Sequence, residues 1–276
     1  MLQTIVLKLP EFILLIYAGT IMLYFIDFID KNRIVNKIAF RFLSIVWLLQ
    51  TIFLFLYMFQ IGRFPILTLF EGLYFYTWIL ITLSLVIHKI YQVDFTVFFT
   101  NLVGFTMMAI HAFAPIQKPT TLIAEQLMSE LLVIHITLAI LSYGAFTASF
   151  VFSMMYVLQY RLLKQKKWKQ RLWRFSDLGK LENLVYRFQI IGIPILLLSL
   201  ILGLQWGMIK LPNLLLYDPK IIGSFLLLIS YGIISYLYKK GSLFGIQFAF
   251  WNMIAFLIIL VNFFLISRLS LFHIWE

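Results

Sequence analysis

The chain has no cysteine among its 276 residues, only four histidines, and charged side chains at only 12% of its positions. The absence of cysteine excludes disulfide bonds, thiolate metal ligands and cysteine nucleophiles. Neutral imidazole is a common ligand for metals in proteins. A histidine-ligated metal or cofactor must therefore use one or more of His88, His111, His135 and His273.

Long apolar runs dominate what is present. Hydrophobic residues make up 63% of the chain and its mean hydropathy is +0.98, well above the composition of soluble domains. Runs of about twenty apolar residues can cross the hydrocarbon core of a bilayer. Eight such runs occur, at 9–29, 38–60, 66–89, 94–114, 130–160, 187–209, 219–238 and 243–267. They predict an all-α polytopic membrane protein with eight transmembrane helices, organised as a single membrane domain over residues 1–276.

The distribution of basic residues predicts the orientation of this domain. Most of the 22 lysines and arginines lie in the connections after the first, third, fifth and seventh runs. By the positive-inside rule these connections are cytoplasmic, so both termini are expected outside. The net charge of +11 is then explained mostly by the basic residues that set the topology. Because the basic residues lie beside the predicted spans and not on a soluble fold, nucleic acid is excluded as a partner.

Two connections are long enough to carry structure of their own. The outer loop 112–129 has room for a short interfacial helix. The cytoplasmic segment 161–187 combines many basic residues with Trp168 and Trp173, a pattern typical of a helix on an anionic leaflet. This segment is either a basic anchor that fixes topology or a docking surface for a cytoplasmic protein.

The segment 203–220 interrupts two apolar runs on the outer side and is expected to form a loop. Gly203 permits a close approach of backbone or ligand, and Trp206 and Tyr217 could present flat rings to a planar ligand. Asp218 stands directly before a proline and is expected to cap the seventh span. An ordinary outer loop with interfacial aromatics explains these residues one by one, but not their order and spacing together.

Three of the four histidines are expected on the same outer side as this segment. His111 ends the fourth run, His135 begins the fifth, and His273 follows the eighth. Imidazole is the commonest axial base for haem iron, and ionisable groups inside spans are usually functional. His135 is the strongest candidate ligand, whereas His273 and His111 could equally be interfacial residues. His88 lies at the inner end of the third run and is expected to point toward the cytoplasmic interface.

Glu71 is a carboxylate inside the third run. An unpaired charge is costly at that depth, so Glu71 is expected to have a partner or to keep its proton. Arg63, eight residues earlier, is a candidate partner.

At these residues the chain resembles the cytochrome c assembly family of haem-handling membrane proteins. Trp206 and the sequence Tyr-Asp-Pro-Lys at 217–220 are similar to that family's tryptophan-rich outer loop, which ends in Trp-Asp-Pro-Lys, and His135 and His273 flank it. The segments Phe64–Leu73 and Leu132–Tyr143 resemble two further family elements. The resemblance implies haem b as the cofactor, with His135 and His273 as axial ligands of the haem iron. It also implies that Trp206, Tyr217, Asp218 and His111 contribute to the cofactor site.

Departures from the family pattern favour binding over catalysis. Most aromatic residues of the outer loop are replaced over 210–216, and the eighth run carries no histidine for a second intramembrane pair. With its eight runs, the chain most resembles the regulatory members of the family, which implies a non-enzymatic protein of a bacterial plasma membrane that lowers the level of glutamyl-tRNA reductase. The implied partners are haem, the lipid bilayer, glutamyl-tRNA reductase on the cytoplasmic side and a second copy of the chain. The alternatives are a component of a cytochrome c synthase or haem exporter that delivers haem to the outer face, and a structural protein that keeps the fold without haem.

Overall fold

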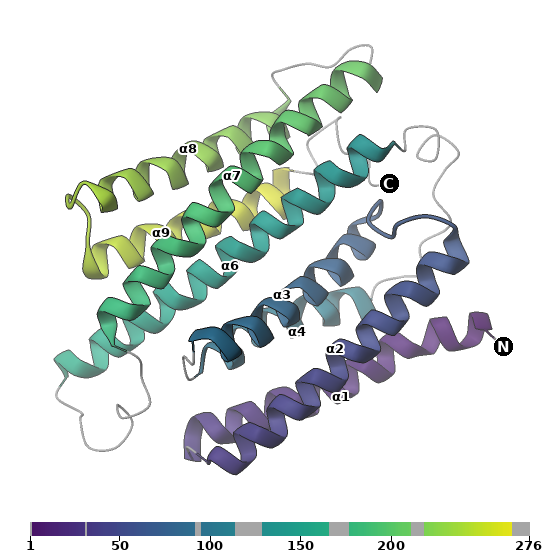
Figure 1. Cartoon of the computed structure of the whole chain (residues 1–276), viewed down its shortest axis with the longest axis horizontal. Helices are drawn as coiled ribbons and strands as arrows, with labels where there is room; N and C mark the ends of the chain where they lie inside the picture. The colour runs from purple at the N-terminus through teal and green to yellow at the C-terminus, as the bar shows by residue number, and fades with distance from the viewer. Residues whose placement is uncertain are drawn as a thin grey trace. The chain divides into compact units, whose positions relative to one another are not determined.

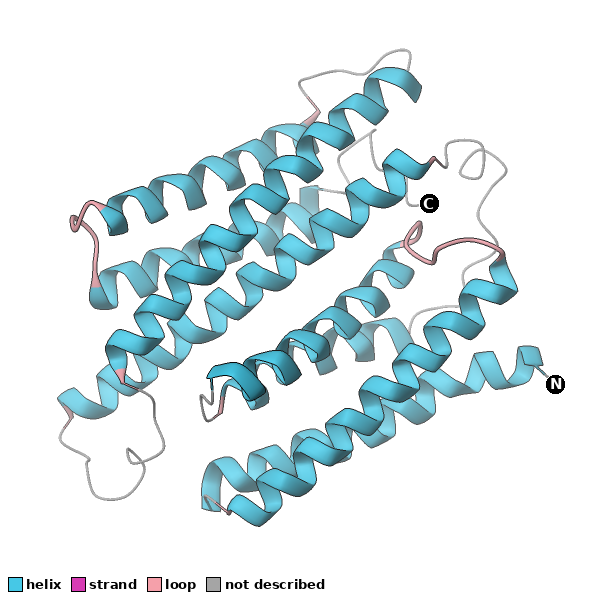
Figure 2. Cartoon of the chain, viewed as in Figure 1, coloured by secondary structure: helices cyan, strands magenta, loops and turns pink. Residues whose placement is uncertain are grey.

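The computed structural model describes residues 2–30, 32–91, 95–113, 129–165, 177–210 and 218–266. Throughout these ranges the regular elements are helices and there is no strand (Figure 1, Figure 2), which confirms the all-α prediction for this part of the chain. Among the described helices, seven are long and apolar enough to cross a membrane. The protein is therefore a multi-pass membrane protein. The fourth predicted span corresponds to a helix of 17 residues, Thr96–Ala112, whereas the shortest of the seven candidate spans, Gly245–Phe264, has 20.

The chain forms two compact units, Met1–Glu125 and Gln126–Glu276. The described part of the first unit contains α1 (Leu2–Asp30), α2 (Arg33–Ile61), α3 (Leu69–Tyr91) and α4 (Thr96–Ala112). Helix α2 begins at an Asn32 cap, whose side chain accepts hydrogen bonds from two amides of the first turn, and ends at Gly62 in the left-handed conformation. Both are common devices for satisfying the exposed backbone groups of a helix end.

Polar side chains connect three helices of the first unit inside its core. The fully buried Tyr17 of α1 donates a hydrogen bond to Asn101 Oδ1 of α4 at 2.8 Å. Asn101 Nδ2 in turn donates to Ser84 Oγ of α3, also at 2.8 Å. Because buried polar groups are costly without partners, this chain of bonds favours one arrangement of α1, α3 and α4.

The second unit contains α6 (Glu130–Lys164), α7 (Leu178–Lys210), α8 (Pro219–Lys239) and α9 (Gly245–Val261), which continues as a π-helical turn, Asn262–Ile266. Helices α6 and α7 run antiparallel and lie side by side along most of their length, as the teal and green ribbons of Figure 1 show. Helix α9 packs against α6, and α8 packs against both α7 and α9.

Small residues allow α6 and α7 to approach closely at two levels. A Cβ atom at Gly192 would lie 2.7 Å from the ring of Phe146, and one at Gly203 would lie 2.5 Å from the ring of His135. Each pair joins one residue of α6 to one of α7, eleven positions apart on both helices, as expected for antiparallel neighbours in a constant register. Small residues are the usual means of close packing between transmembrane helices.

A buried polar network joins all four helices of the second unit near their middle. Gln189 Nε2 of α7 donates to Asn252 Oδ1 of α9 at 2.6 Å, and Asn252 Nδ2 donates to Ser153 Oγ of α6 at 2.8 Å. Ser235 of α8 donates to Gln189 Oε1 at 2.7 Å. These bonds stabilise the relative positions of α6 to α9, and with them the positions of the residues nearer the helix ends.

Candidate functional site

His135 lies near the start of α6, in its second turn, and its side chain is buried at 8% exposure. Its Nδ1 is 2.6 Å from the carbonyl oxygen of Ser199 on α7. A carbonyl oxygen only accepts hydrogen bonds, so Nδ1 must carry the proton and Nε2 the lone pair. Ser199 Oγ also donates to the carbonyl oxygen of His135 at 2.9 Å, which ties the two helices together at this level.

This arrangement is the one that metal-ligating histidines adopt. Such residues generally donate their second ring N–H to a carbonyl or carboxylate, which fixes the tautomer and the orientation of the ring. In His135 the proton on Nδ1 makes Nε2 the ring nitrogen that carries the lone pair. The described side chain therefore fits the role of an axial haem ligand.

Gly203 of α7 makes room for the imidazole. A Cβ atom at this position would lie 2.5 Å from Cε1, 2.7 Å from Nδ1 and 3.1 Å from Nε2 of His135. Such distances are shorter than van der Waals contact, so no larger residue fits without moving the ring. Gly203 therefore serves as a packing surface for the imidazole, and the close approach expected at this glycine is made by a side chain of α6.

The expectation of a loop from Gly203 to Lys220 was wrong for its first part. Helix α7 continues to Lys210, so Gly203 and Trp206 are helical. Glycine is tolerated inside transmembrane helices where a neighbouring helix packs against it, and here that neighbour is His135. Trp206, one turn after Gly203, is only 4% exposed, and its indole is packed within the second unit instead of forming an open platform.

The prediction that Asp218 caps the next helix is confirmed. Its side chain accepts a hydrogen bond from the Lys220 amide at 2.8 Å, and Pro219 occupies the first helical turn of α8. Proline is favoured at that position because its missing N–H is not needed there. Asp218 is itself buried at 7% exposure.

Lys220 makes a buried contact with Asn262 that could not be predicted from the sequence. Its ammonium group is buried and donates a hydrogen bond to the carbonyl oxygen of Asn262 at 2.8 Å. It also lies 5.8 Å from the ring centre of Phe263, within cation–π range. A cation near the C-terminal end of a helix interacts favourably with its dipole, so Lys220 stabilises the end of α9 against the start of α8.

Asn262 is the centre of the contacts at this end of α9. Its Nδ2 donates to Ser224 Oγ of α8 at 3.2 Å, and its carbonyl oxygen accepts the hydrogen bond from Lys220. The backbone adopts a π-helical turn from Asn262 onward. This conformation is rare in proteins as a whole, but where it does occur it is frequently at a functional site. His135, Trp206 and Asp218 belong to the same unit as this turn.

The remaining candidate residues are distributed differently. His273 and Tyr217 lie outside the described residues, so their roles stay predictions. His111 is at the end of α4 in the first unit, where its Nδ1 is 2.9 Å from the carbonyl oxygen of Phe70 and its ring centre 5.0 Å from that of Tyr74. It shows the same pairing of imidazole with backbone carbonyl as His135.

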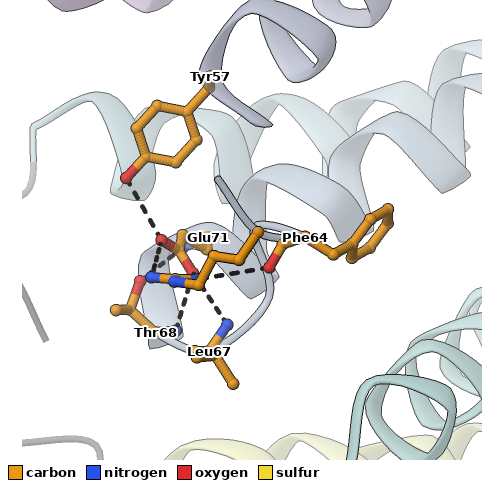
Figure 3. Close-up of polar contacts among 6 residues, drawn as sticks. Tyr57, Phe64, Leu67, Thr68 and Glu71 are labelled. Carbon is orange, nitrogen blue, oxygen red and sulfur yellow. Dashed lines mark hydrogen bonds and ion pairs between the residues drawn. The ribbon is translucent and has the colours of Figure 1, made fainter. Parts of the chain in front are cut away.

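Glu71 has the partner predicted for it. Arg63 donates two hydrogen bonds to its carboxylate, at 2.9 and 3.0 Å, and the Leu67 amide donates a third at 2.8 Å (Figure 3). Tyr57 approaches the same carboxylate at 3.3 Å. The Thr68 amide donates as well, at 3.2 Å, so five hydrogen bonds hold the carboxylate and Glu71 organises the turn before α3.

Within the described ranges, no three histidine, aspartate or glutamate side chains gather as a site for a bare metal ion. Haem does not require such a cluster, because the porphyrin supplies its own equatorial nitrogens and the protein adds axial ligands. A single well-oriented imidazole such as that of His135 is therefore compatible with haem and not with a protein-only metal centre.

The comparisons with known proteins agree with this chemistry. Residues 66–273 match the family described as cytochrome C assembly protein. The chain is 50% identical to Protein HemX of Bacillus subtilis (strain 168) over 273 residues, which cover 99% of both chains. It is 42% identical to Protein HemX of Brevibacillus brevis over 260 residues, covering 94% of this chain and 95% of the relative. A third relative, the cytochrome c biogenesis protein CcsA of Chlamydomonas reinhardtii, is 26% identical over 168 residues, or 58% of this chain and 45% of its own. The chain belongs to the cytochrome c assembly protein family.

Proposed function

We propose that this protein is a non-enzymatic haem-binding regulator of haem synthesis. Haem b binds without covalent attachment, since the chain has no cysteine, and His135 and His273 are the axial ligands of its iron. The observation that carries this proposal is the hydrogen bond between His135 Nδ1 and the Ser199 carbonyl, which presents Nε2 for coordination. Trp206 and Asp218, which belong to the same unit as His135, together with Tyr217 complete the surroundings of the cofactor.

The proposed topology has eight spans, with α4 as the shortest, and both termini outside a bacterial plasma membrane. Basic residues at the helix ends support this orientation. Arg161 and Lys164 end α6, Lys239 ends α8, and Arg33 begins α2. The positive-inside rule places these ends in the cytoplasm, and His135, at the other end of α6, then lies toward the outer face.

The proposed output is a lower level of glutamyl-tRNA reductase, the enzyme that commits the cell to haem synthesis. Such regulation requires that haem at the outer face changes something in the cytoplasm. Helix α6 offers a physical connection because it carries His135 near one end and Arg161 and Lys164 at the other. At a rise of about 1.5 Å per residue, a small tilt of this helix on haem binding displaces its basic end and the segment 161–187 that continues from it.

The alternative function is delivery of haem to the outer face, as part of a cytochrome c synthase or a haem exporter. The observation that supports haem delivery is the 26% identity to a cytochrome c biogenesis protein over 168 residues. The two functions differ in what a deletion strain loses.

A deletion strain complemented with either the wild-type chain or His135→Ala separates these functions. We expect glutamyl-tRNA reductase, measured by immunoblot, to rise in the deletion strain and to return to its normal level only with the wild-type chain. Haem-stained c-type cytochromes should stay constant in all three strains. Loss of the cytochromes with an unchanged reductase level would contradict the proposal and support haem delivery.

A further inference from the structure

An open groove lies between the C-terminal end of α6 and the N-terminal end of α9, far along α6 from His135. Its volume is about 420 Å³, within the range typical of small-molecule sites. Six of the described residues line it: Val157, Arg161, Ile246, Gln247, Phe250 and Trp251. We propose that this groove binds one anionic phospholipid, with an acyl chain along its apolar floor and the phosphate at Arg161.

The lining is arranged as an amphiphile requires. Val157 and Arg161 are one turn apart on α6 and share a face. On α9, Gln247 is in the first turn and Phe250 and Trp251 follow one turn deeper. Arg161 and Gln247 thus lie near the ends of the two helices, where the headgroup region of a bilayer is expected. Of the apolar side chains, Val157, Phe250 and Trp251 lie about one turn farther from those ends, whereas Ile246 lies beside Gln247.

Arg161 supplies the charge that selects the headgroup. It is exposed, and among the described residues no carboxylate forms an ion pair with it. It is the only charged residue among those lining the groove. A guanidinium group can bind phosphate through two parallel hydrogen bonds, and basic pockets between transmembrane helices are known to hold anionic headgroups.

The shape of the groove separates it from the rest of the lipid-facing surface. Exposed apolar side chains such as Phe250 and Trp251, at 58% and 50% exposure, are ordinary on a membrane protein. A hollow of this volume beside an unpaired cation is not explained by general contact with lipid. Free phosphate does not suit it either, because four of the six lining residues are apolar and cannot replace water around an ion.

Two pairs of matched variants test the two halves of the site. Arg161→Gln removes the cation that lines the groove. Its control, Lys164→Gln, removes a cation from the same last turn of α6 that does not line the groove. Val157→Trp fills the groove while keeping the charge, and Leu158→Trp adds the same ring at an exposed position of α6 outside it. Each full-length protein is purified in detergent and offered equal amounts of phosphatidylglycerol and phosphatidylcholine.

Native mass spectrometry then measures which lipid remains bound. We expect the wild-type chain to retain phosphatidylglycerol in preference to phosphatidylcholine, and Arg161→Gln to reduce that preference about fivefold, the effect of one basic residue at an anionic surface. Val157→Trp should abolish retention of both lipids, and both controls should behave as wild type.

Three outcomes overturn the proposal. They are equal retention of the two lipids by the wild-type chain, equal effects of Arg161→Gln and Lys164→Gln, and a Val157→Trp variant that still retains lipid. Should Val157→Trp instead convert a dimer into a monomer with lipid retention unchanged, the groove is a contact between two copies of the chain. None of these outcomes depends on haem or on the regulatory function.

Discussion

Replacing Arg63 by methionine is expected to destabilise the protein by about 3–5 kcal/mol, the cost of removing one partner from a buried ion pair. The side chains of Arg63 and Glu71 are only 11% and 6% exposed. Without Arg63, the Glu71 carboxylate would keep its backbone donors at Leu67 and Thr68 but lose its counter-charge at a site that is almost closed to solvent. The measurement is denaturant unfolding of the purified protein in detergent.

Two further variants make this prediction specific. The double variant Arg63→Met, Glu71→Leu removes both charges, so it should be less destabilised than Arg63→Met alone. The exposed pair of Lys8 and Glu11, at 3.9 Å and with side chains 76% and 61% exposed, is the control, and Lys8→Met should change stability by about 0–1 kcal/mol. Equal effects of Arg63→Met and Lys8→Met would show that the pair in Figure 3 contributes little to stability.

The second large effect is expected at Gly203, where alanine should weaken haem binding at least about tenfold, or about 1.4 kcal/mol. Its Cβ would lie 2.5 Å from the imidazole of His135, so the ring must move away from the Ser199 carbonyl that orients it. Overpacking of this kind also costs about 1–3 kcal/mol in stability. Haem titration followed by absorbance, together with an unfolding curve, measures both effects.

Gly232→Ala on α8 is the matched control because no atom lies within 4 Å of the Cβ that it would add. Alanine has the higher helix propensity, so this variant should be as stable as the wild type or more stable by up to about 1 kcal/mol. Its haem affinity should be unchanged. If Gly203→Ala binds haem as tightly as Gly232→Ala does, the close packing of His135 against α7 has no part in the site.

Structural features that depend on residues close together in the chain could be predicted from the sequence. Hydropathy located the helices because a span needs a continuous apolar run. The cap at Asp218 and the partner of Glu71 followed from local rules, since a capping aspartate precedes its helix directly and Arg63 is only eight residues from Glu71. In each case the interacting groups lie in one segment of the chain.

Contacts between distant segments could not be predicted in this way. Ser199, the partner of His135, is 64 positions away and occurs in an apolar run with no motif around it. Lys220 is the last residue of the Tyr-Asp-Pro-Lys sequence, and nothing in that sequence predicts its buried contact with Asn262, 42 positions away. A polar residue in an apolar run is the one signal that could have drawn attention to Ser199, because such residues often hydrogen-bond to a neighbouring helix.

The helical conformation of Gly203 and Trp206 also depends on a contact with a distant segment of the chain, so it could not be predicted from the local sequence. Glycine, glutamine and tryptophan close together suggested an irregular segment, because glycine has low helix propensity. The decisive factor is the imidazole of His135, which packs where a side chain at position 203 would be. Only the pairing of α6 with α7 reveals that the glycine is a contact surface.

The most direct test of the central claim is the absorption spectrum and pyridine haemochrome of the protein purified from haem-replete cells, compared with those of His135→Ala. We expect the wild-type protein to contain haem b in a six-coordinate, low-spin state. We expect His135→Ala to lose haem or to hold five-coordinate iron, with the six-coordinate spectrum restored by added imidazole. A wild-type protein that contains no haem, or a His135→Ala variant with an unchanged six-coordinate spectrum, would contradict it.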